Sequence, residues 1–333
     1  MLPTVSEIES SAHNIYSVFS PTPQYRWPLL SERLGVDIWV KHENHTPVGA
    51  FKVRGGLVYF AALAGNRAIK EVITATRGNH GQSVALSAKK YGISSTIVVP
   101  IGNSVEKNAA MRALGARLIE HGDDFQAARE HAASVAEVSG AHMLPSFHPL
   151  LVQGVATYAL ELFRAVSDLD YMYVPIGLGS GICGAIAVRN ALSPKTKIVG
   201  VVSAHAPAYA LSFSARQARE SPVSTVLADG MACRIPQPEA LETIWKYVDH
   251  IVEVTDNEIA EAMRTVYECT HNCAEGAGAA AIAAVAKERD RLKKKRVATV
   301  LSGGNVDRVV FANVLLALPY TIGRLPMCPR ETD

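Results

Sequence analysis

Apolar, strand-like runs alternate with amphipathic, helix-compatible segments from Val36 onward, and this alternation constrains the fold more than any other feature. Several strand-like runs are continuously apolar, as expected when helices cover both faces of a sheet. The pattern predicts an α/β protein with mostly parallel sheets and helices on both faces. The expected strands are residues 37–43, 71–75, 95–100, 116–121, 170–175, 197–202, 248–254 and 296–301, and the expected helices include 79–91, 104–114, 123–139, 152–165, 256–270 and 305–316.

Size and composition narrow the class of protein. The chain has 333 residues, which is long enough for two domains, and it is 48% hydrophobic and 19% charged, as in globular proteins. A net charge of +2 gives no broad basic field, so we expect no nucleic-acid partner. We see no signal peptide and no apolar run of about 18–20 residues, so no membrane partner is expected. Five cysteines, an odd and small number, suit free thiols in a cytoplasmic protein.

Lys52 lies in an unusual segment, residues 47–56, just after a loop and at or near the first turn of an expected helix. A helix start is electropositive, so a cation there is disfavoured. The pKa of a crowded lysine shifts readily, and its neutral amine forms Schiff bases with carbonyls. Lys52 is therefore the candidate catalytic residue, although this segment taken alone favours an ordinary surface lysine.

Residues 74–82 form the first of three loops that follow expected strands and carry unusual residues. Gly78 and Gly81 permit close approach of a ligand to the backbone. The amides of the helix start that follows suit an anion such as a carboxylate, and Asn79 offers a donor and an acceptor. Capping of the helix by Thr76 or Asn79 is an alternative that is compatible with ligand binding.

The second loop, residues 175–184, places Gly177, Gly179 and Gly181 between a strand and a helix, which is typical of a phosphate cradle of backbone amides. It also matches a dinucleotide fingerprint, but the next strand ends at Ser203 without the expected carboxylate. A nicotinamide-dependent dehydrogenase is therefore disfavoured. The third loop, residues 301–305, places the Ser302 hydroxyl at another strand end, where it would face a ligand or cap a helix.

Nine short motifs span nearly the whole chain, at residues 41–44, 49–55, 78–82, 115–116, 154–157, 177–184, 228–230, 275–279 and 302–305. In this order they resemble the fold-type-II pyridoxal-phosphate enzymes, and most closely the serine/threonine dehydratase branch, which is related to serine racemase. The resemblance implies a two-domain architecture. Residues 1–69 and 149–333 would form a large cofactor-binding domain, and residues 70–148 a small mobile domain that closes over the substrate. It also implies a possible homodimer.

The resemblance implies a role for each matching position. Lys52 would carry pyridoxal 5'-phosphate in covalent linkage and then move protons, with Phe51 beside it. Asn79 would bind the ring hydroxyl, and Ser302 would meet the pyridine nitrogen. The phosphate would be bound by the second loop, at Gly177, Leu178, Gly179, Ser180 and Gly181. The substrate carboxylate would be bound by the first loop, at Thr76, Arg77, Gly78, Asn79 and His80.

The implied reaction is an elimination. A neutral hydroxyl such as that of Ser302 stabilises a charged ring nitrogen less than a carboxylate does, so the ring is a weaker electron sink. This favours prompt loss of a β-leaving group over a long-lived carbanion. Lys52 would take the α-proton of a threonine- or serine-like amino acid. The β-hydroxyl would leave, and the products would be a 2-oxo acid and ammonia.

Departures from the family pattern keep alternatives open. Arg77 stands where dehydratases usually have a small residue and serine racemases a serine, which puts racemization in doubt. Its guanidinium could clamp a second carboxylate of the substrate. Together with Val155 and Leu178, Arg77 motivates a bulkier or acidic substrate such as phenylserine or hydroxyaspartate.

Other functions fit the pattern less well. The dipeptide at residues 80–81 is His-Gly, whereas β-replacing synthases usually show Thr-Gly there. Lys52 argues against a non-catalytic binding protein. No carboxylate follows the strand ending at Val202, and the pair of Cys269 and Cys273 has no second pair close by, so no metal site is expected. The chain stops at Asp333 without a regulatory domain, so feedback control by isoleucine is not expected.

Overall fold

The computed structural model describes residues 2–66 and 68–318. Among the expected free thiols, Cys328 lies outside the described residues. The other four cysteines are free, at positions 183, 233, 269 and 273. None of the described helices is both long and apolar enough to cross a membrane.

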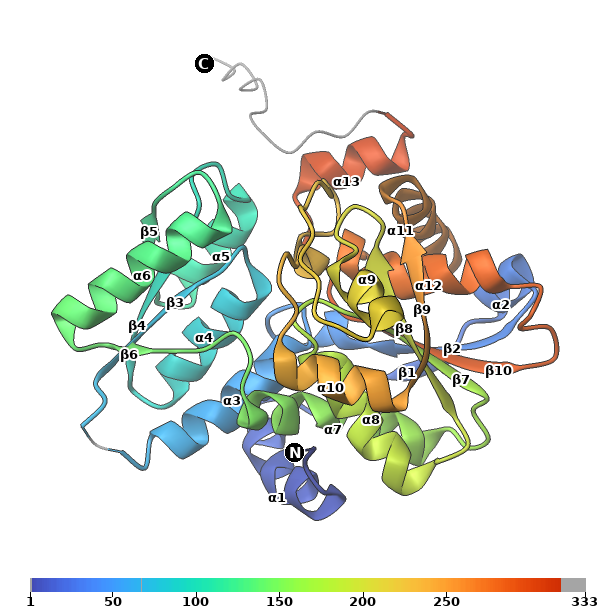
Figure 1. Cartoon of the computed structure of the whole chain (residues 1–333), viewed down its shortest axis with the longest axis horizontal. Coiled ribbons are helices and arrows are strands. Elements are labelled where there is room, and N and C mark those ends of the chain that lie inside the picture. The colour runs from blue at the N-terminus through green and yellow to red at the C-terminus, as the bar shows by residue number, and fades with distance from the viewer. Residues whose placement is uncertain (1, 67, 319–333) are drawn as a thin grey trace, which may run out of the picture.

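Two sheets lie side by side in the molecule (Figure 1). The six-stranded sheet has the order β1 (Gln24–Arg26), β2 (Asp37–His42), β10 (Arg296–Leu301), β7 (Tyr171–Pro175), β8 (Lys197–Ser203) and β9 (Val248–Val254). The four-stranded sheet has the order β5 (Arg117–Glu120), β4 (Ser94–Val99), β3 (Glu71–Ala75) and β6 (His142–Met143). Neighbouring strands pair in parallel, except for β1 and β2. The predicted α/β class with mostly parallel sheets is confirmed.

Helices cover both faces of the six-stranded sheet, because successive side chains of a buried strand point to opposite faces. Val199 and Val201 of β8 join a core with α2 (Pro28–Leu34), α11 (Asp256–Thr270) and α12 (Gly276–Glu288). Ile198 and Val202 join the opposite core, which is completed by α1 (Val5–Tyr16), α7 (Pro149–Ala165), α8 (Ser180–Leu192), α9 (Ala208–Ala215) and α10 (Pro238–Tyr247).

The four-stranded sheet has the same layered construction. Ile73 and Val98 pack against α6 (Phe125–Ser139) on one face. Val72 and Ile97 face α4 (Asn79–Lys90) and α5 (Val105–Ala113) on the other. These elements occupy residues 71–143, within the expected small domain. That residues 70–148 move as a separate domain stays a prediction.

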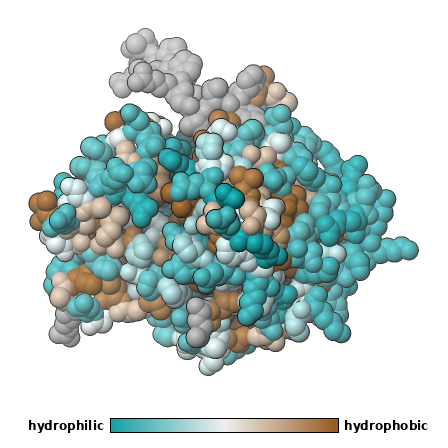
Figure 2. Space-filling view, in the orientation of Figure 1, coloured by the Kyte–Doolittle hydropathy of each residue, from teal (hydrophilic) through white to brown (hydrophobic). Residues whose placement is uncertain are grey.

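Figure 2 shows mainly hydrophilic side chains on the right-hand side of this view, with hydrophobic side chains scattered elsewhere.

The expected strands are confirmed to within about two residues, and most expected helices are present. Some ends are set by caps: α11 begins with a capping box in which the Thr255 and Glu258 side chains each accept the other residue's backbone N–H. The helix expected over residues 305–316 is wrong at its start. The observed helix is α13 (Arg308–Leu315). Asn305 lies in the loop before it, because the Asn305 side chain makes hydrogen bonds to two neighbouring segments.

The helix that carries Lys52, α3 (Lys52–Leu63), is clamped between α4 and α7. Gly154 of α7 allows this, because a Cβ there would lie 2.4 Å from the Arg54 carbonyl oxygen. A Cβ on Gly56 would lie 2.3 Å from Ser83 Oγ of α4. Backbone-to-backbone packing therefore fixes the position of α3, and with it that of Lys52.

Candidate active site

The start of α3 and the loop after β10 are joined directly. The Phe51 N–H donates to the Ser302 carbonyl at 3.0 Å, and the Gly304 N–H donates to the Gly49 carbonyl at 2.9 Å. The predicted position of Lys52, in the first turn of a helix, is confirmed, and the structure brings it beside Ser302. The Ser302 side chain is buried, and its hydroxyl donates weakly to the Ala277 carbonyl at 3.3 Å.

Lys52 is suited to act as a neutral amine. Burial lowers its pKa, and the negative charge of Glu275 opposes that shift only in part. The Nζ atom of Lys52 lies 5.0 Å from the centroid of the Phe51 ring. A lysine whose charged form is disfavoured supplies both a nucleophile and a proton acceptor.

In the described part of the chain, the loop after β7 leaves backbone amides free at the start of α8. Gly179 has φ of 100°, and α8 begins immediately after it. The Leu178 carbonyl accepts the Tyr209 hydroxyl at 3.0 Å, so the N–H of the same trans peptide points the opposite way. Within the described chain, the amides of residues 177–182 have no backbone acceptor. A Cβ on Gly177 would lie 2.3 Å from the Gly230 carbonyl oxygen, so only glycine fits there.

The loop after β3 ends at the start of α4. Thr76 Oγ1 accepts the Gly78 N–H at 3.0 Å, so Thr76 stabilises the loop, whereas the Asn79 side chain does not cap the helix. Within the described chain, the N–H groups of residues 79–81 have no backbone acceptor, which leaves them for an anion. Of the five residues of the predicted carboxylate site, Arg77, Asn79 and His80 have backbone N–H groups without a hydrogen-bond acceptor in the described chain, and those of Asn79 and His80 lie in the first turn of α4.

His80 is a buried, neutral ring that interacts electrostatically with Lys52. Burial, with a smaller contribution from the charge of Lys52, lowers its pKa to about 3. Its Nε2 atom is buried and has no hydrogen-bond partner among the described residues. A buried polar atom without a partner is costly in a folded protein, so this position suits a bound ligand.

Three charged residues near these loops were not assigned roles from the sequence. Glu275, buried at the start of α12, accepts from Asn79 Nδ2. Lys107 of α5 is buried, and its Nζ lies 3.4 Å from Glu275 Oε2 and 3.9 Å from Asp229 Oδ2. Arg77 Nη1 lies 3.4 Å from Asp229 Oδ1. Glu275 and Asp229 lie in two of the nine short motifs, so the sequence could have indicated them. No sequence motif marks Lys107.

A cleft of about 1380 Å³ opens beside these loops. Its walls come from β3 and its following loop, α6, residues 143–147, Leu178 and residues 220–238. Three arginines line it, Arg77, Arg129 and Arg234, against two acids, Asp124 and Glu220. Lys52 does not line this cleft, whereas Arg77 and Leu178, from the loops after β3 and β7, do.

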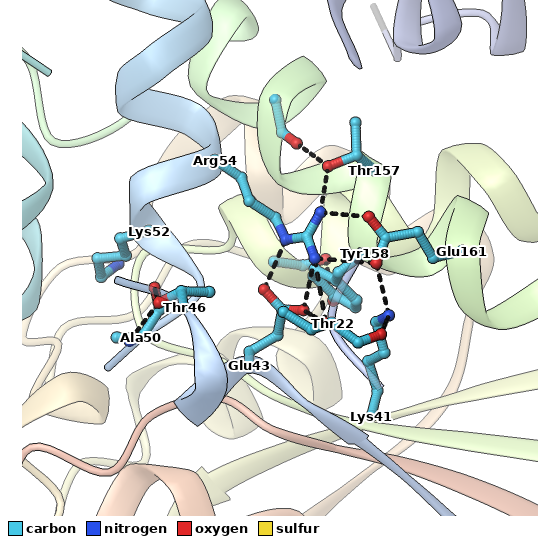
Figure 3. A network of polar contacts seen from close by, with 12 residues as sticks. Thr22, Lys41, Glu43, Thr46, Ala50, Lys52, Arg54, Thr157, Tyr158 and Glu161 are labelled. Carbon is cyan, nitrogen blue, oxygen red and sulfur yellow. Dashed lines mark hydrogen bonds and ion pairs between the residues drawn. The ribbon is translucent and has the colours of Figure 1, made fainter. Parts of the chain in front are cut away.

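A buried network of charges anchors α3 behind Lys52. Arg54 donates to Glu43 Oε2 and Glu161 Oε1, each at 2.6 Å. Thr157 and Thr22 complete its hydrogen bonds. Figure 3 shows Arg54 and Lys52 leaving α3 on opposite sides. Glu43 and Glu161 hold the pKa of Arg54 above its usual value despite its burial.

These residues fit pyridoxal phosphate. The cofactor carries a phosphate, an aldehyde, a ring nitrogen and a ring oxygen. The glycine cradle after β7 offers amides to the phosphate, and Lys52 offers an amine to the aldehyde. Ser302 and Asn79 offer polar groups to the ring. The unpaired Nε2 of His80 is consistent with a further contact to a ligand.

Comparisons with known proteins agree with this geometry. The chain is 35% identical to the L-threonine ammonia-lyase of Thermotoga maritima, over 91% of this chain and 76% of that one. Its fold is similar to the processed threonine deaminase isoform 2 of Solanum lycopersicum, with a TM-score of 0.85 at 30% identity, covering 94% of this chain and 93% of that one. It is also similar to maize serine racemase, with a TM-score of 0.88 at 25% identity, covering 95% and 98%.

The chain spans about 60% of the length of the biosynthetic L-threonine dehydratase of Haemophilus influenzae, to which it is 31% identical over 91% of its own length. Residues 15–303 match the family described as pyridoxal-phosphate dependent enzymes. With that match covering most of its length, the chain belongs to the pyridoxal-phosphate dependent enzymes.

Proposed function

We propose that this enzyme is an ammonia-lyase that eliminates the β-hydroxyl of a threonine- or serine-like amino acid to give a 2-oxo acid and ammonia. One observation carries the proposal: the buried amine of Lys52 lies beside the Ser302 loop, and its pKa is lowered. The names of the relatives support the same reaction, since one is an L-threonine ammonia-lyase and another a threonine deaminase.

Several residues of the chain have separate roles in the proposed reaction. When bound, the cofactor draws electrons from the substrate Cα and so makes the α-proton acidic. Lys52 Nζ is the base that takes this proton. The amides of Asn79 and His80 at the start of α4 bind and orient the substrate carboxylate. Ser302, a neutral group, meets the ring nitrogen and favours elimination over a long-lived carbanion.

Racemization is not part of the proposal. Arg77 precedes Gly78, where a serine racemase carries its serine, and its guanidinium faces Asp229. An ion-paired guanidinium is a poor acid at neutral pH. Within the proposed small domain, α5 meets α13 through Ser104 with Asp307 and through Glu106 with the Arg308 N–H. These contacts support our proposal that residues 70–148 close over the substrate and exclude water. A cytoplasmic location is also proposed.

The reaction is tested with the purified protein and added pyridoxal phosphate. We expect a visible absorption band and release of 2-oxo acid from L-threonine or L-serine, measured by coupled reduction of the oxo acid. Borohydride should fix the cofactor to the protein. Absence of oxo acid from threonine, serine, phenylserine and hydroxyaspartate alike would refute the proposed reaction, and failure to bind the cofactor would refute the site.

A second candidate substrate class is a β-hydroxy amino acid with an additional carboxylate. The cationic lining of the cleft favours it, because Arg77 is joined there by Arg129 and Arg234. The Arg77–Asp229 contact is long, at 3.4 Å, and partly exposed, so a substrate carboxylate can compete for the guanidinium. A bidentate contact of this kind would select acidic substrates over threonine.

This candidate predicts a selective effect of Arg77→Ala. We expect kcat/KM for hydroxyaspartate to fall by about 10- to 100-fold, the loss typical of a hydrogen bond to a charged group, with less than about a threefold change for threonine. Arg112→Ala, which changes an exposed arginine outside the cleft, is the control. Equal losses on both substrates would argue against an acidic substrate.

A further inference from the structure

Two hydrogen bonds fix the orientation of the Asn305 carboxamide. Its Nδ2 atom donates to the Val48 carbonyl at 2.8 Å and to Asn79 Oδ1 at 2.9 Å. Both partners are oxygen acceptors, so only the amino group of Asn305 can occupy this position. The Asn305 amide therefore requires an oxygen, not an amino group, from Asn79.

The orientation of Asn79 follows from that of Asn305. Its Oδ1 accepts from Asn305, and its Nδ2 donates one hydrogen to Glu275 Oε1. A carboxamide has two N–H donors, so one remains for a bound group. Gly303 leaves room for this arrangement, because a Cβ there would lie 2.4 Å from Glu275 Oε1 and 3.2 Å from Asn79 Nδ2.

Lys107 balances the charge of Glu275. Glu275 is the N-cap residue of α12, yet its side chain makes no capping bond and instead faces Asn79 and Lys107. Burial disfavours the charge of Lys107, but Glu275 and Asp229 together hold its pKa above the usual value. A buried carboxylate is stable only with such a partner. Glu275 therefore pairs with Lys107 through one carboxylate oxygen and accepts from Asn79 through the other.

We propose that Asn305, Glu275 and Lys107 are positioning residues that hold the Asn79 amide with its free N–H toward the ring oxygen of the cofactor. An N–H donor favours the negative form of that oxygen, whereas a reversed amide would repel it. The inference rests on the proposed role of Asn79. Asn79 and Lys107 come from the four-stranded-sheet part, and Glu275 and Asn305 from the six-stranded-sheet part, so the arrangement forms only when the two meet.

The test is a spectroscopic pH titration of the protein loaded with pyridoxal phosphate, with no substrate present. Asn305→Asp removes the donor to Asn79, and Lys107→Met removes the charge that balances Glu275. Each should shift the titration midpoint of the cofactor upward by about one pH unit, as expected for loss of a hydrogen bond to a charged group. Lys107→Arg, which keeps the cation, should restore most of the wild-type midpoint.

Arg112→Ala is the matched control, because Arg112 lies on the same helix as Lys107 but is exposed and pairs with Glu120. It should leave the midpoint unchanged. Thermal unfolding of each loaded variant separates a general loss of structure from this specific shift. Asn305→Ala, which removes the donor to Asn79 without adding a charge, supplies a second variant should Asn305→Asp fail to fold. An unchanged midpoint in Asn305→Asp or in Asn305→Ala overturns the proposal. Because catalysis is not measured, failure of the proposed reaction would leave this result intact.

Discussion

Replacing Lys52 with alanine should lower the rate of 2-oxo acid formation by about 10³-fold or more, the scale expected when a catalytic base is removed. The loss should be larger if the covalent link to the cofactor also depends on this amine. The position is fixed by backbone packing of α3 against its neighbours rather than by the lysine side chain, so the variant should fold. Activity with threonine and serine, measured beside circular dichroism, checks both expectations.

Borohydride labelling sharpens this prediction. In the wild-type protein the cofactor label should map to the peptide that contains Lys52, and it should be absent from the Lys52→Ala variant. Lys107 is the informative competitor, because it is buried near the same loops. Its pKa is raised, so it stays charged and should not be labelled. Lys90→Ala, at an exposed lysine, is the control. A label on Lys107 would contradict the assignment of Lys52.

The convergence of the loops after β7 and β10 was predictable because the carboxyl ends of parallel strands in one sheet meet at the same edge. The loop after β3 belongs to the four-stranded sheet, and packing between the two parts of the molecule brings it beside the loop after β10. The loops after β3, β7 and β10 each follow a strand that its continuous apolar run had indicated. The closely spaced glycines and the polar residues at the ends of those strands indicated that the loops bind a ligand. Roles for Lys52, Asn79 and Ser302 needed the family resemblance, because local sequence does not distinguish a cap from a ligand contact.

The charged partners of the site could not be predicted in the same way. Lys107 reaches Glu275 from a helix of the other sheet, and only packing of its stem beside Gly78 places it there. Hydrophobic periodicity describes which face of a helix is buried but not which distant acid it meets.

The network of charges around Arg54 could be found only from the fold. The second prediction with a large expected effect concerns this network. Arg54→Met should lower the free energy of unfolding by about 3–5 kcal/mol, because it leaves two buried carboxylates without their common cation. Glu43 and Arg54 are fully buried, and Glu161 nearly so. Lys41, at 2.5 Å from Glu161, remains as a partner for that acid only. Chemical denaturation of the wild type and variant checks this. Arg112→Met, which breaks an exposed pair with Glu120, should cost less than about 1 kcal/mol.

A second substitution separates the penalty of an unpaired charge from the loss of packing. If the cost of Arg54→Met comes from the stranded charge of Glu43, then adding Glu43→Gln should recover part of the lost stability, although it removes yet another native contact. The recovery should be visible as a positive coupling energy in a double-mutant cycle. If the double variant is instead less stable than Arg54→Met alone, shape and hydrogen bonding, rather than charge balance, hold α3 in place behind Lys52.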